Sequence, residues 1–330
     1  MATTSESRAA VHADAARPGV AGLALLFLAA VALRPLLSEW LDAPGLSNWA
    51  TIFVAISVQA VPFLVLGVTV SGAIAAFVPP DTLRQILPRA PALAVPVAAA
   101  SGVALPGCEC GSVPIAGRLV AHRVPPAAAL AFLLAAPAIN PVVLLATAFA
   151  FPGQPEFVFA RFAASLLAAI TVGLVWVAKG RPEWTAKAAR QAQGVPGSPW
   201  STFVATTQHD FLHAGGFLVI GAAAAATLQT LVPRSVLDAV SDAGVLSVVA
   251  LAVLAFVLAI CSEADAFVAA GLTQFSPTAR LAFLVVGPMV DVKLVALQAG
   301  TFGRSFAVRF APLTFVVALA SASLVGWWLL

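Results

Sequence analysis

Long apolar runs separated by short polar segments make up most of this chain. Nine runs approach or exceed the roughly 20 apolar residues that a helix needs to cross the hydrocarbon of a bilayer. Their approximate bounds are 19–37, 49–78, 91–121, 125–151, 157–178, 209–232, 244–273, 280–301 and 306–330. The pattern predicts an all-α polytopic membrane protein with about eight or nine transmembrane segments.

Two of these runs are interrupted near their middle. The run 91–121 contains Pro106-Gly107 and Gly111, and the run 244–273 contains the polar stretch Cys261–Asp265. Irregular backbone at membrane depth occurs where protein or a water-filled cavity satisfies it. We therefore expect broken helices or re-entrant hairpins here, with plain full-length helices as the alternative.

The second half of the chain repeats the pattern of the first. Phe63-Leu-Val-Leu-Gly67 aligns with Phe217-Leu-Val-Ile-Gly221 at an offset of 154 residues, and Cys108 then falls opposite Cys261. Further on, three more pairs match in order: Phe132 and Phe283, Pro137 and Pro288, Asn140 and Asp291. A fixed period of this kind indicates an internal repeat. We predict a first transmembrane repeat over 49–178 and a second over 203–330.

Composition supports the membrane assignment and excludes several classes. Of 330 residues, 61% are apolar and 9% are charged, against about 25% charged in soluble domains, and the mean hydropathy is +1.00. The net charge of +3 comes without a basic run, so no nucleic-acid partner is expected. The three cysteines do not indicate a disulfide framework. No nucleotide-binding motif occurs, and no cofactor is expected.

Charge also predicts the topology. Residues 1–18 are expected to form a disordered tail, 19–37 a retained first transmembrane helix, and the basic stretch 179–202 a cytoplasmic linker. If 91–121 and 244–275 enter and leave on the same side, the basic segments and the N-terminus are cytoplasmic. Each half then crosses three times, so the two repeats are inverted. Full-length spans would instead place 179–202 outside.

The first candidate site is Cys108-Glu109-Cys110, followed by Ser112. Thiolates are soft ligands that select thiophilic ions, and two cysteines separated by one residue can reach a common centre where the backbone turns sharply. The alternative is that both are small buried side chains in a kink. A carboxylate at this depth favours a functional site, because burying it is costly.

A second cluster comprises Cys261, Ser262, Glu263 and Asp265. Two neighbouring carboxylates disfavour each other's charged form, which suits groups that take up and release protons. The alternative is a helix end at the membrane surface, where both acids are hydrated.

The third cluster is Asp291 with Lys293, opposite Asn140 of the first half. Ionisable groups inside a membrane are expected to be functional, and Asp291 and Asn140 would be paired polar groups from the two halves. Asp291 and Lys293 could instead form a structural ion pair, or Lys293 could pair with Glu263 or Asp265.

Three other polar residues are expected at the membrane surface. Arg161 lies near a predicted helix start, where a long side chain snorkels to the headgroups. His209 and His213 have a spacing that could bind a metal, but they begin a span beside the polar linker, which favours an interface position.

The clusters resemble the ArsP/YraQ family of predicted bacterial permeases. The resemblance lies in Cys108-x-Cys110-Gly111-x-Val-Pro114, Ala136-Pro137-x-x-Asn140-Pro141 and Cys261-Ser-x-x-Asp265-Ala-Phe267, and it covers most of 50–325. It implies a polytopic inner-membrane permease, and the best-described members export trivalent organoarsenicals with the help of cysteines. Glu109 departs from the small residue expected there, which favours a cationic or proton-coupled substrate.

The sequence thus predicts a multi-pass secondary transporter of the cytoplasmic membrane, not an enzyme. We expect efflux of a small-molecule or ion substrate that is thiophilic, such as a trivalent organoarsenical or a soft metal ion. Its partners are that substrate and the lipid bilayer, and the protein could also form a homo-oligomer.

The expected substrate-binding residues are Cys108, Cys110, Cys261, Asn140, Ser112 and Ser262, with the three cysteines as metal ligands. The proton-coupling or charge-balancing residues are Glu109, Glu263, Asp265, Asp291 and Lys293. The alternatives are a membrane thiol-redox protein using Cys108 and Cys110, and a subunit of a membrane complex that transports nothing itself.

Overall fold

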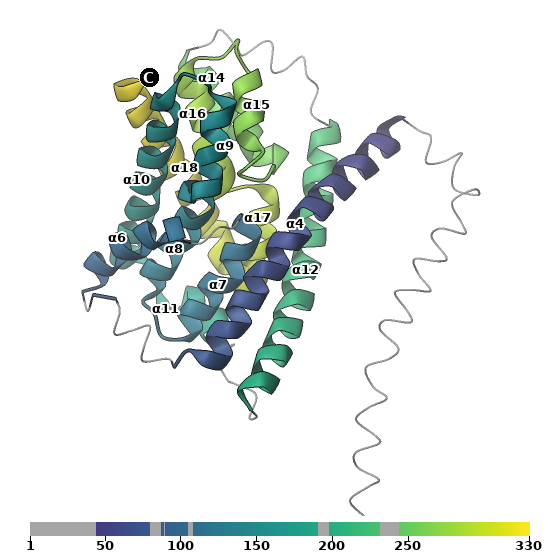
Figure 1. Cartoon of the computed structure of the whole chain (residues 1–330), viewed down its shortest axis with the longest axis vertical. Helices are drawn as coiled ribbons and strands as arrows, with labels where there is room; N and C mark the ends of the chain where they lie inside the picture. Colours follow the sequence, from purple (N-terminus) through teal and green to yellow (C-terminus); the bar gives the residue numbers. More distant parts are fainter. Residues whose placement is uncertain (1–43, 80–86, 89, 105–107, 191–197, 232–243) are drawn as a thin grey trace, which may run out of the picture. The chain divides into compact units, whose positions relative to one another are not determined.

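The computed structural model describes residues 44–79, 87–88, 90–104, 108–190, 198–231 and 244–330 (Figure 1). The predicted tail 1–18 and first transmembrane helix 19–37 lie outside these residues. The chain divides into two compact units, and the second, Thr51–Leu330, contains every helix from α6 onward and most of α4. All regular elements in the described part are helices, which confirms the all-α class.

The helices follow a similar order in the two halves of the chain. The first half contains α4 (Pro44–Phe77), α6 (Pro91–Ser101), the 3-10 turn η1 (Gly102–Ala104), α7 (Glu109–Ala121), α8 (Pro126–Ile139), α9 (Pro141–Ala150) and α10 (Pro155–Lys179). After α11 (Pro182–Arg190), the second half contains α12 (Pro199–Leu231), α14 (Val245–Leu258), α15 (Asp265–Gly271), α16 (Pro277–Met289), α17 (Val292–Thr301) and α18 (Arg304–Leu329).

Proline sets many of the helix starts. Pro occupies the first turn of α6, α8, α9, α10 and α16. At that position its fixed φ fits the helix, and its missing N–H would have had no partner within the helix. The prolines therefore separate consecutive helices of an otherwise nearly continuous apolar sequence.

Among the described residues, six stretches are long and apolar enough to cross a membrane, judged by length and composition. In two of them, Pro126–Ala150 and Pro277–Thr301, the apolar 18-residue window is 78% and 83% buried, whereas in the other four it is 28–44% buried. Helices α8, α16 and α17 therefore lie inside the unit, while α9 leaves Val142, Leu145 and Phe149 exposed. Apolar side chains that the other four leave exposed suit contact with lipid. These spans make the chain a multi-pass membrane protein.

Helix packing around these inner stretches uses glycine at two close contacts. A Cβ on Gly67 of α4 would collide with the Cα of Gly111 in α7, and a Cβ on Gly221 of α12 would lie 2.8 Å from the Cα of Lys293 in α17. Small residues allow such close backbone approach between membrane helices. Both glycines thus pack against a helix that contains predicted site residues, α7 for Gly67 and α17 for Gly221.

The structure differs from the sequence prediction at several helix boundaries. The runs 125–151 and 280–301 each divide into two helices, at Asn140 and at Val290–Asp291. The predicted linker 179–202 contains α11, whose Ala, Lys and Arg residues favour helix. The run 209–232 begins ten residues earlier, at Pro199, because its polar first turns are also helical.

Candidate functional site

The first side of the site is the N-terminus of α7. Cys108 has extended backbone, and its carbonyl oxygen accepts the N–H groups of Gly111 and Ser112 at 3.1 and 3.2 Å, which begins the helix. The side chains of Cys108, Glu109 and Cys110 are fully buried. The Ser112 hydroxyl donates to the carbonyl oxygen of Glu109, so it supports the turn. The break in 91–121 therefore places both thiols and the carboxylate inside the protein.

The second side is the gap between α14 and α15. Helix α14 ends at Ala259, which has a left-handed backbone (φ 47°, ψ 41°), a conformation that is uncommon for a residue with a Cβ. The carbonyl oxygen of Cys261 then accepts the N–H groups of Ala264 and Asp265. This turn carries Cys261 and Ser262, both buried, away from the helix axis.

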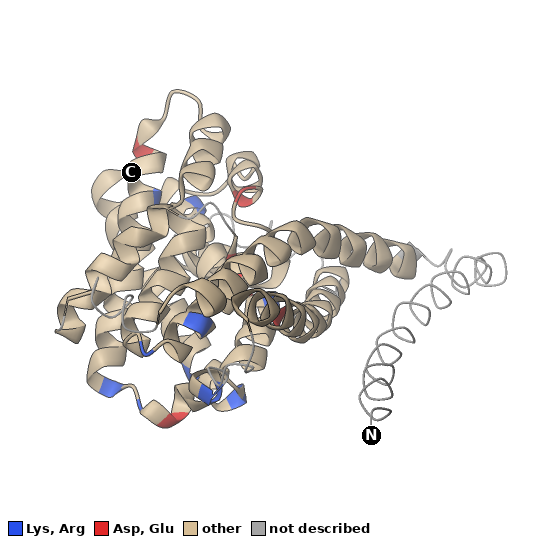
Figure 2. Ribbon diagram, turned by 60° about the horizontal axis from the view of Figure 1, so that its bottom comes forward, with Lys and Arg blue, Asp and Glu red and all other residues tan. Residues whose placement is uncertain are grey.

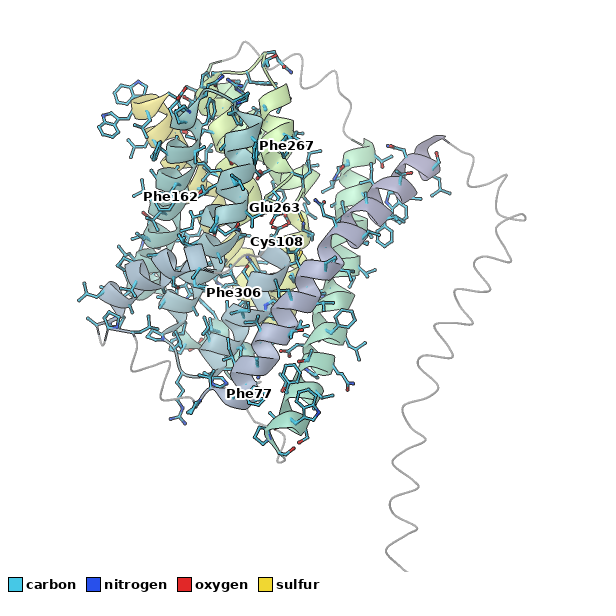
Figure 3. All side chains as sticks on the ribbon, in the orientation of Figure 1. Phe77, Cys108, Phe162, Glu263, Phe267 and Phe306 are labelled. Carbon is cyan, nitrogen blue, oxygen red and sulfur yellow. The ribbon has the colours of Figure 1, made fainter. Side chains whose placement is uncertain are left out.

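The two breaks bring sulfur and carboxylate together. The ligand atoms of Cys108, Glu109 and Cys261 all lie within 4.8 Å of one another, and all three side chains are buried. The thiols of Cys110 and Cys261 both lie near the thiol of Cys108. Figure 3 labels Cys108 and Glu263 in the same middle part of the helices. Two thiols and one carboxylate form a donor set that suits a thiophilic ion.

A buried lysine from the second half completes this cluster. Nζ of Lys293 lies 2.7 Å from Oε1 of Glu109 and 3.9 Å from Oδ2 of Asp291. It also donates to the carbonyl oxygen of Ala259 at 3.2 Å, an acceptor that the end of α14 leaves free. The alternative pairing of Lys293 with Glu263 or Asp265 is therefore not the one in this structure.

Asp291 and Asn140 occupy corresponding helix starts. Asn140 accepts the N–H of Val143 and caps α9, while Asp291 accepts the N–H of Leu294 and caps α17. The Asn140 amide also donates to the carbonyl oxygen of Ala136. A side-chain oxygen at this position satisfies one of the free N–H groups of a helix start. Asn140 therefore joins two helices, whereas Asp291 combines a cap with a charge beside Lys293.

Arg161 is a site residue that the sequence analysis placed wrongly. Its side chain is fully buried in α10, not at the membrane surface. One guanidinium nitrogen lies 2.8 Å from Oδ2 of Asp265 and donates to the carbonyl oxygen of Ser262, and the other donates to Thr147. Because Arg161 pairs with the buried carboxylate of Asp265, its side chain stays inside the protein and does not extend to the headgroups. The signal available in the sequence was an ionisable residue inside the apolar run 157–178.

Several other polar atoms between α14 and α15 lack hydrogen-bond partners. The Ser262 hydroxyl, one oxygen of Asp265 and both oxygens of Glu263 have no hydrogen-bond partner among the described residues. Buried polar atoms are nearly always paired, so each such atom needs an explanation. These groups are free to bind a proton, a water or a substrate.

A further ion pair lies at the other end of α7. Arg118 lies 2.9 Å from Asp210 of α12, and the Ser71 hydroxyl donates to the same carboxylate. His213, predicted at an interface, lies 3.0 Å from the carbonyl oxygen of Gly300, while His209 is exposed. These contacts join α7 to α12 and α4.

The fold and these clusters define a class, a polytopic all-α membrane protein with buried charge and sulfur where its helices break. Within that class, the chain belongs to the ArsP_1 family of predicted permeases, whose profile matches residues 46–327. The UPF0718 protein YcgR of Bacillus subtilis strain 168 is 36% identical over 281 residues, which cover 83% of this chain and 96% of the relative. A Streptococcus mutans serotype c protein is 31% identical over 282 residues, 83% of this chain and 94% of its own, and is named a putative two-component membrane permease complex subunit. No solved structure matches significantly.

Proposed function

We propose that this permease is a secondary transporter of the cytoplasmic membrane that exports a thiophilic substrate. The single observation that carries the proposal is the buried group of Cys108, Glu109 and Cys261, whose ligand atoms lie within 4.8 Å of one another. These residues come from two helix breaks that are far apart in sequence.

The substrate class is a trivalent organoarsenical or a soft metal ion. A soft cation would replace the thiol protons of Cys108 and Cys261 and take Glu109 as a third, oxygen ligand. A trivalent arsenical carrying two hydroxyl groups would form two As–S bonds, with the two hydroxyls leaving as water together with the thiol protons. Cys110 lies near Cys108, so we assign it to exchange of the substrate between thiols.

The N-termini of two helices favour this chemistry. Helix α7 begins at Cys108 and α17 begins at Asp291, and Glu109 and Lys293 hold these two starts together. A helix N-terminus carries a partial positive charge that stabilises nearby thiolates and carboxylates. Half-helix ends of this kind are a recurring way to build substrate sites in transporters.

Transport would alternate access between two inverted repeats. Support comes from the similar order of helices α4 to α10 and α12 to α18. In Figure 1, α6 and α7 lie in the lower half of the helices, while α14 and α15 lie at the top. Most Lys and Arg positions lie in the lower half of Figure 2, which favours placing that side in the cytoplasm. We also place the N-terminus in the cytoplasm, on the positive-inside argument from the sequence.

Protons would drive the export through the acidic groups around the thiols. Both oxygens of Glu263 and one oxygen of Asp265 lack partners among the residues that the structure describes. Asp265 is balanced by Arg161, and Asp291 by Lys293. Buried carboxylates with a fixed counter-charge can accept or release a proton as the substrate leaves.

A cysteine series in a host sensitive to arsenic and metals tests the proposal. Cys108→Ser and Cys261→Ser should abolish resistance and substrate export in everted vesicles, because each removes one of two sulfur ligands. Thr69→Ala is a matched control, since its exposed hydroxyl bonds only within its own helix. Unchanged resistance and accumulation in both serine variants would remove thiols from the mechanism.

The closeness of the Cys108 and Cys110 thiols also favours a second candidate, a membrane thiol-redox protein. That function needs a partner that reduces the pair, and it uses Cys110 as much as Cys108. Full loss of resistance in Cys261→Ser with Cys108 and Cys110 intact would favour transport, because the redox function does not need the third thiol.

A further inference from the structure

Lys293 occupies the carboxylate that a cationic substrate would need. Its Nζ lies 2.7 Å from Oε1 of Glu109, and Glu109 is one of the three residues in the ligand group with Cys108 and Cys261. Two cations on one buried carboxylate repel each other strongly, since the surroundings screen charge poorly. Oε2 of Glu109 has no hydrogen-bond partner among the described residues, but a soft cation bound there would lie close to the ammonium group, so its binding favours movement of Lys293 away from Glu109.

A second carboxylate, that of Asp291, lies near enough to accept the ammonium group of Lys293. Oδ2 of Asp291 lies 3.9 Å from Nζ of Lys293 and has no hydrogen-bond partner among the described residues. A small rotation of the lysine side chain would shorten this distance to a hydrogen bond. The carbonyl oxygen of Ala259, 3.2 Å from Nζ, is a further acceptor beside the lysine.

Asp291 carries a charge that its capping role does not need. Oδ1 alone accepts the N–H of Leu294 and caps α17. At the corresponding position before α9, the amide of Asn140 makes the same cap without a charge. The second oxygen of Asp291 is therefore available for a different purpose.

We propose that Lys293 is a tethered cation that moves between Glu109 and Asp291, and that a soft cationic substrate takes its place on Glu109. The proposal rests on the proposed function of the site and narrows its substrate class. Moving Lys293 from one carboxylate to the other keeps its ammonium group paired, which avoids the cost of an isolated buried ammonium group. A neutral organoarsenical carries no charge to displace the lysine, so the geometry favours a soft metal cation.

Release follows from the same arrangement. While the cation is bound, Lys293 rests on Asp291; when Lys293 returns to Glu109, it displaces the cation from its oxygen ligand. The lysine thus lowers the affinity of the site for the cation and speeds its release. A transporter needs such a balance, because a substrate that binds too tightly is not released.

Cadmium binding to purified full-length protein tests the proposal through a double-mutant cycle. Lys293→Gln removes the competitor and should raise Cd²⁺ affinity about tenfold or more while slowing export. Asp291→Asn keeps the cap of α17 but removes the carboxylate that would pair with Lys293 while the cation is bound. It should lower Cd²⁺ affinity about 10- to 100-fold. In the Lys293→Gln background, Asp291→Asn should have almost no effect, because no ammonium group remains to be moved.

Asp210→Asn is the matched control, since it neutralises a carboxylate paired with Arg118 instead of Lys293. It should leave Cd²⁺ affinity unchanged. If Asp291→Asn does not yield folded protein, Lys293→Arg replaces it: the charge stays on Glu109, so its Cd²⁺ affinity should not rise as that of Lys293→Gln does.

Two results would overturn the inference. One is Cd²⁺ binding that Lys293→Gln weakens or leaves unchanged, and the other is an equal effect of Asp291→Asn with and without Lys293. A wild-type protein that binds neither Cd²⁺ nor phenylarsenite would instead refute the thiophilic site itself. Tight binding of phenylarsenite without Cd²⁺ binding would keep the site and refute the cationic substrate.

Discussion

Nζ of Lys293 donates to Oε1 of Glu109 at 2.7 Å and joins residues 184 positions apart in the sequence. Both side chains are buried, so their charges have little access to water. The pair holds the first turns of α7 and α17 together and lies at the edge of the cysteine group. One contact thus links the packing of the two halves to the chemistry of the site.

Breaking this pair on one side should destabilise the protein strongly. Glu109→Gln or Lys293→Met should each lower the free energy of unfolding by about 3–5 kcal/mol, because one charge is left buried without its partner. The double variant should lose clearly less than the sum of the two. Unfolding of the purified proteins in detergent measures all three, and additive losses would show that the two charges do not interact.

Arg161 should not be replaceable by lysine. Its two terminal nitrogens reach Thr147, Asp265 and the carbonyl oxygen of Ser262, a fork that an ammonium group cannot reproduce. Arg161→Lys should lower stability by about 1–3 kcal/mol and reduce export. Arg304→Lys is the control, because Arg304 is exposed at the start of α18. Equal stability of the two variants would contradict the assigned role.

Gly67 and Gly221 should not tolerate a methyl group. A Cβ at either position would meet backbone of the facing helix, Gly111 or Lys293 respectively, and neither helix can move without disturbing the site. Gly67→Ala and Gly221→Ala should lower both folded yield and substrate binding. Gly216→Ala, on α12 with nothing within 4 Å of its Cβ, should be neutral or stabilise by about 0.5–1 kcal/mol. A harmless Gly221→Ala would argue against the close contact.

Hydropathy in the sequence sufficed to predict the class of fold. The apolar runs predict helices close to those observed, and the polar interruptions at Cys108 and Cys261 mark where two helices end. The breaks at Asn140 and Val290–Asp291 were harder to place, because α8 and α9 are apolar on both sides of Asn140. The start of the second helix is set locally, by Pro141 in its first turn and by the hydrogen bond from the Val143 N–H to the Asn140 side chain.

The candidate site was predictable as a set of residue types, while its pairings were not. Spacing indicates that Cys108 and Cys261 correspond, and their positions predict a shared site. The sequence leaves Asp291, Glu263 and Asp265 as possible partners of Lys293, because charge alone does not specify which helices face each other. In the structure its closest partner is Glu109. Arg161 was assigned to the surface because its place near a helix start resembles that of a snorkelling residue, and only the packing of α10 against its neighbours buries it.

X-ray absorption spectroscopy of the protein with one bound Cd²⁺ ion tests the thiophilic site most directly, because it reports the atoms that surround the metal. The buried group of Cys108, Glu109 and Cys261 predicts two sulfur ligands with the remaining ligands oxygen or nitrogen, and one sulfur in the Cys261→Ser variant. A first shell of oxygen and nitrogen alone, or a spectrum that Cys261→Ser does not change, would contradict it.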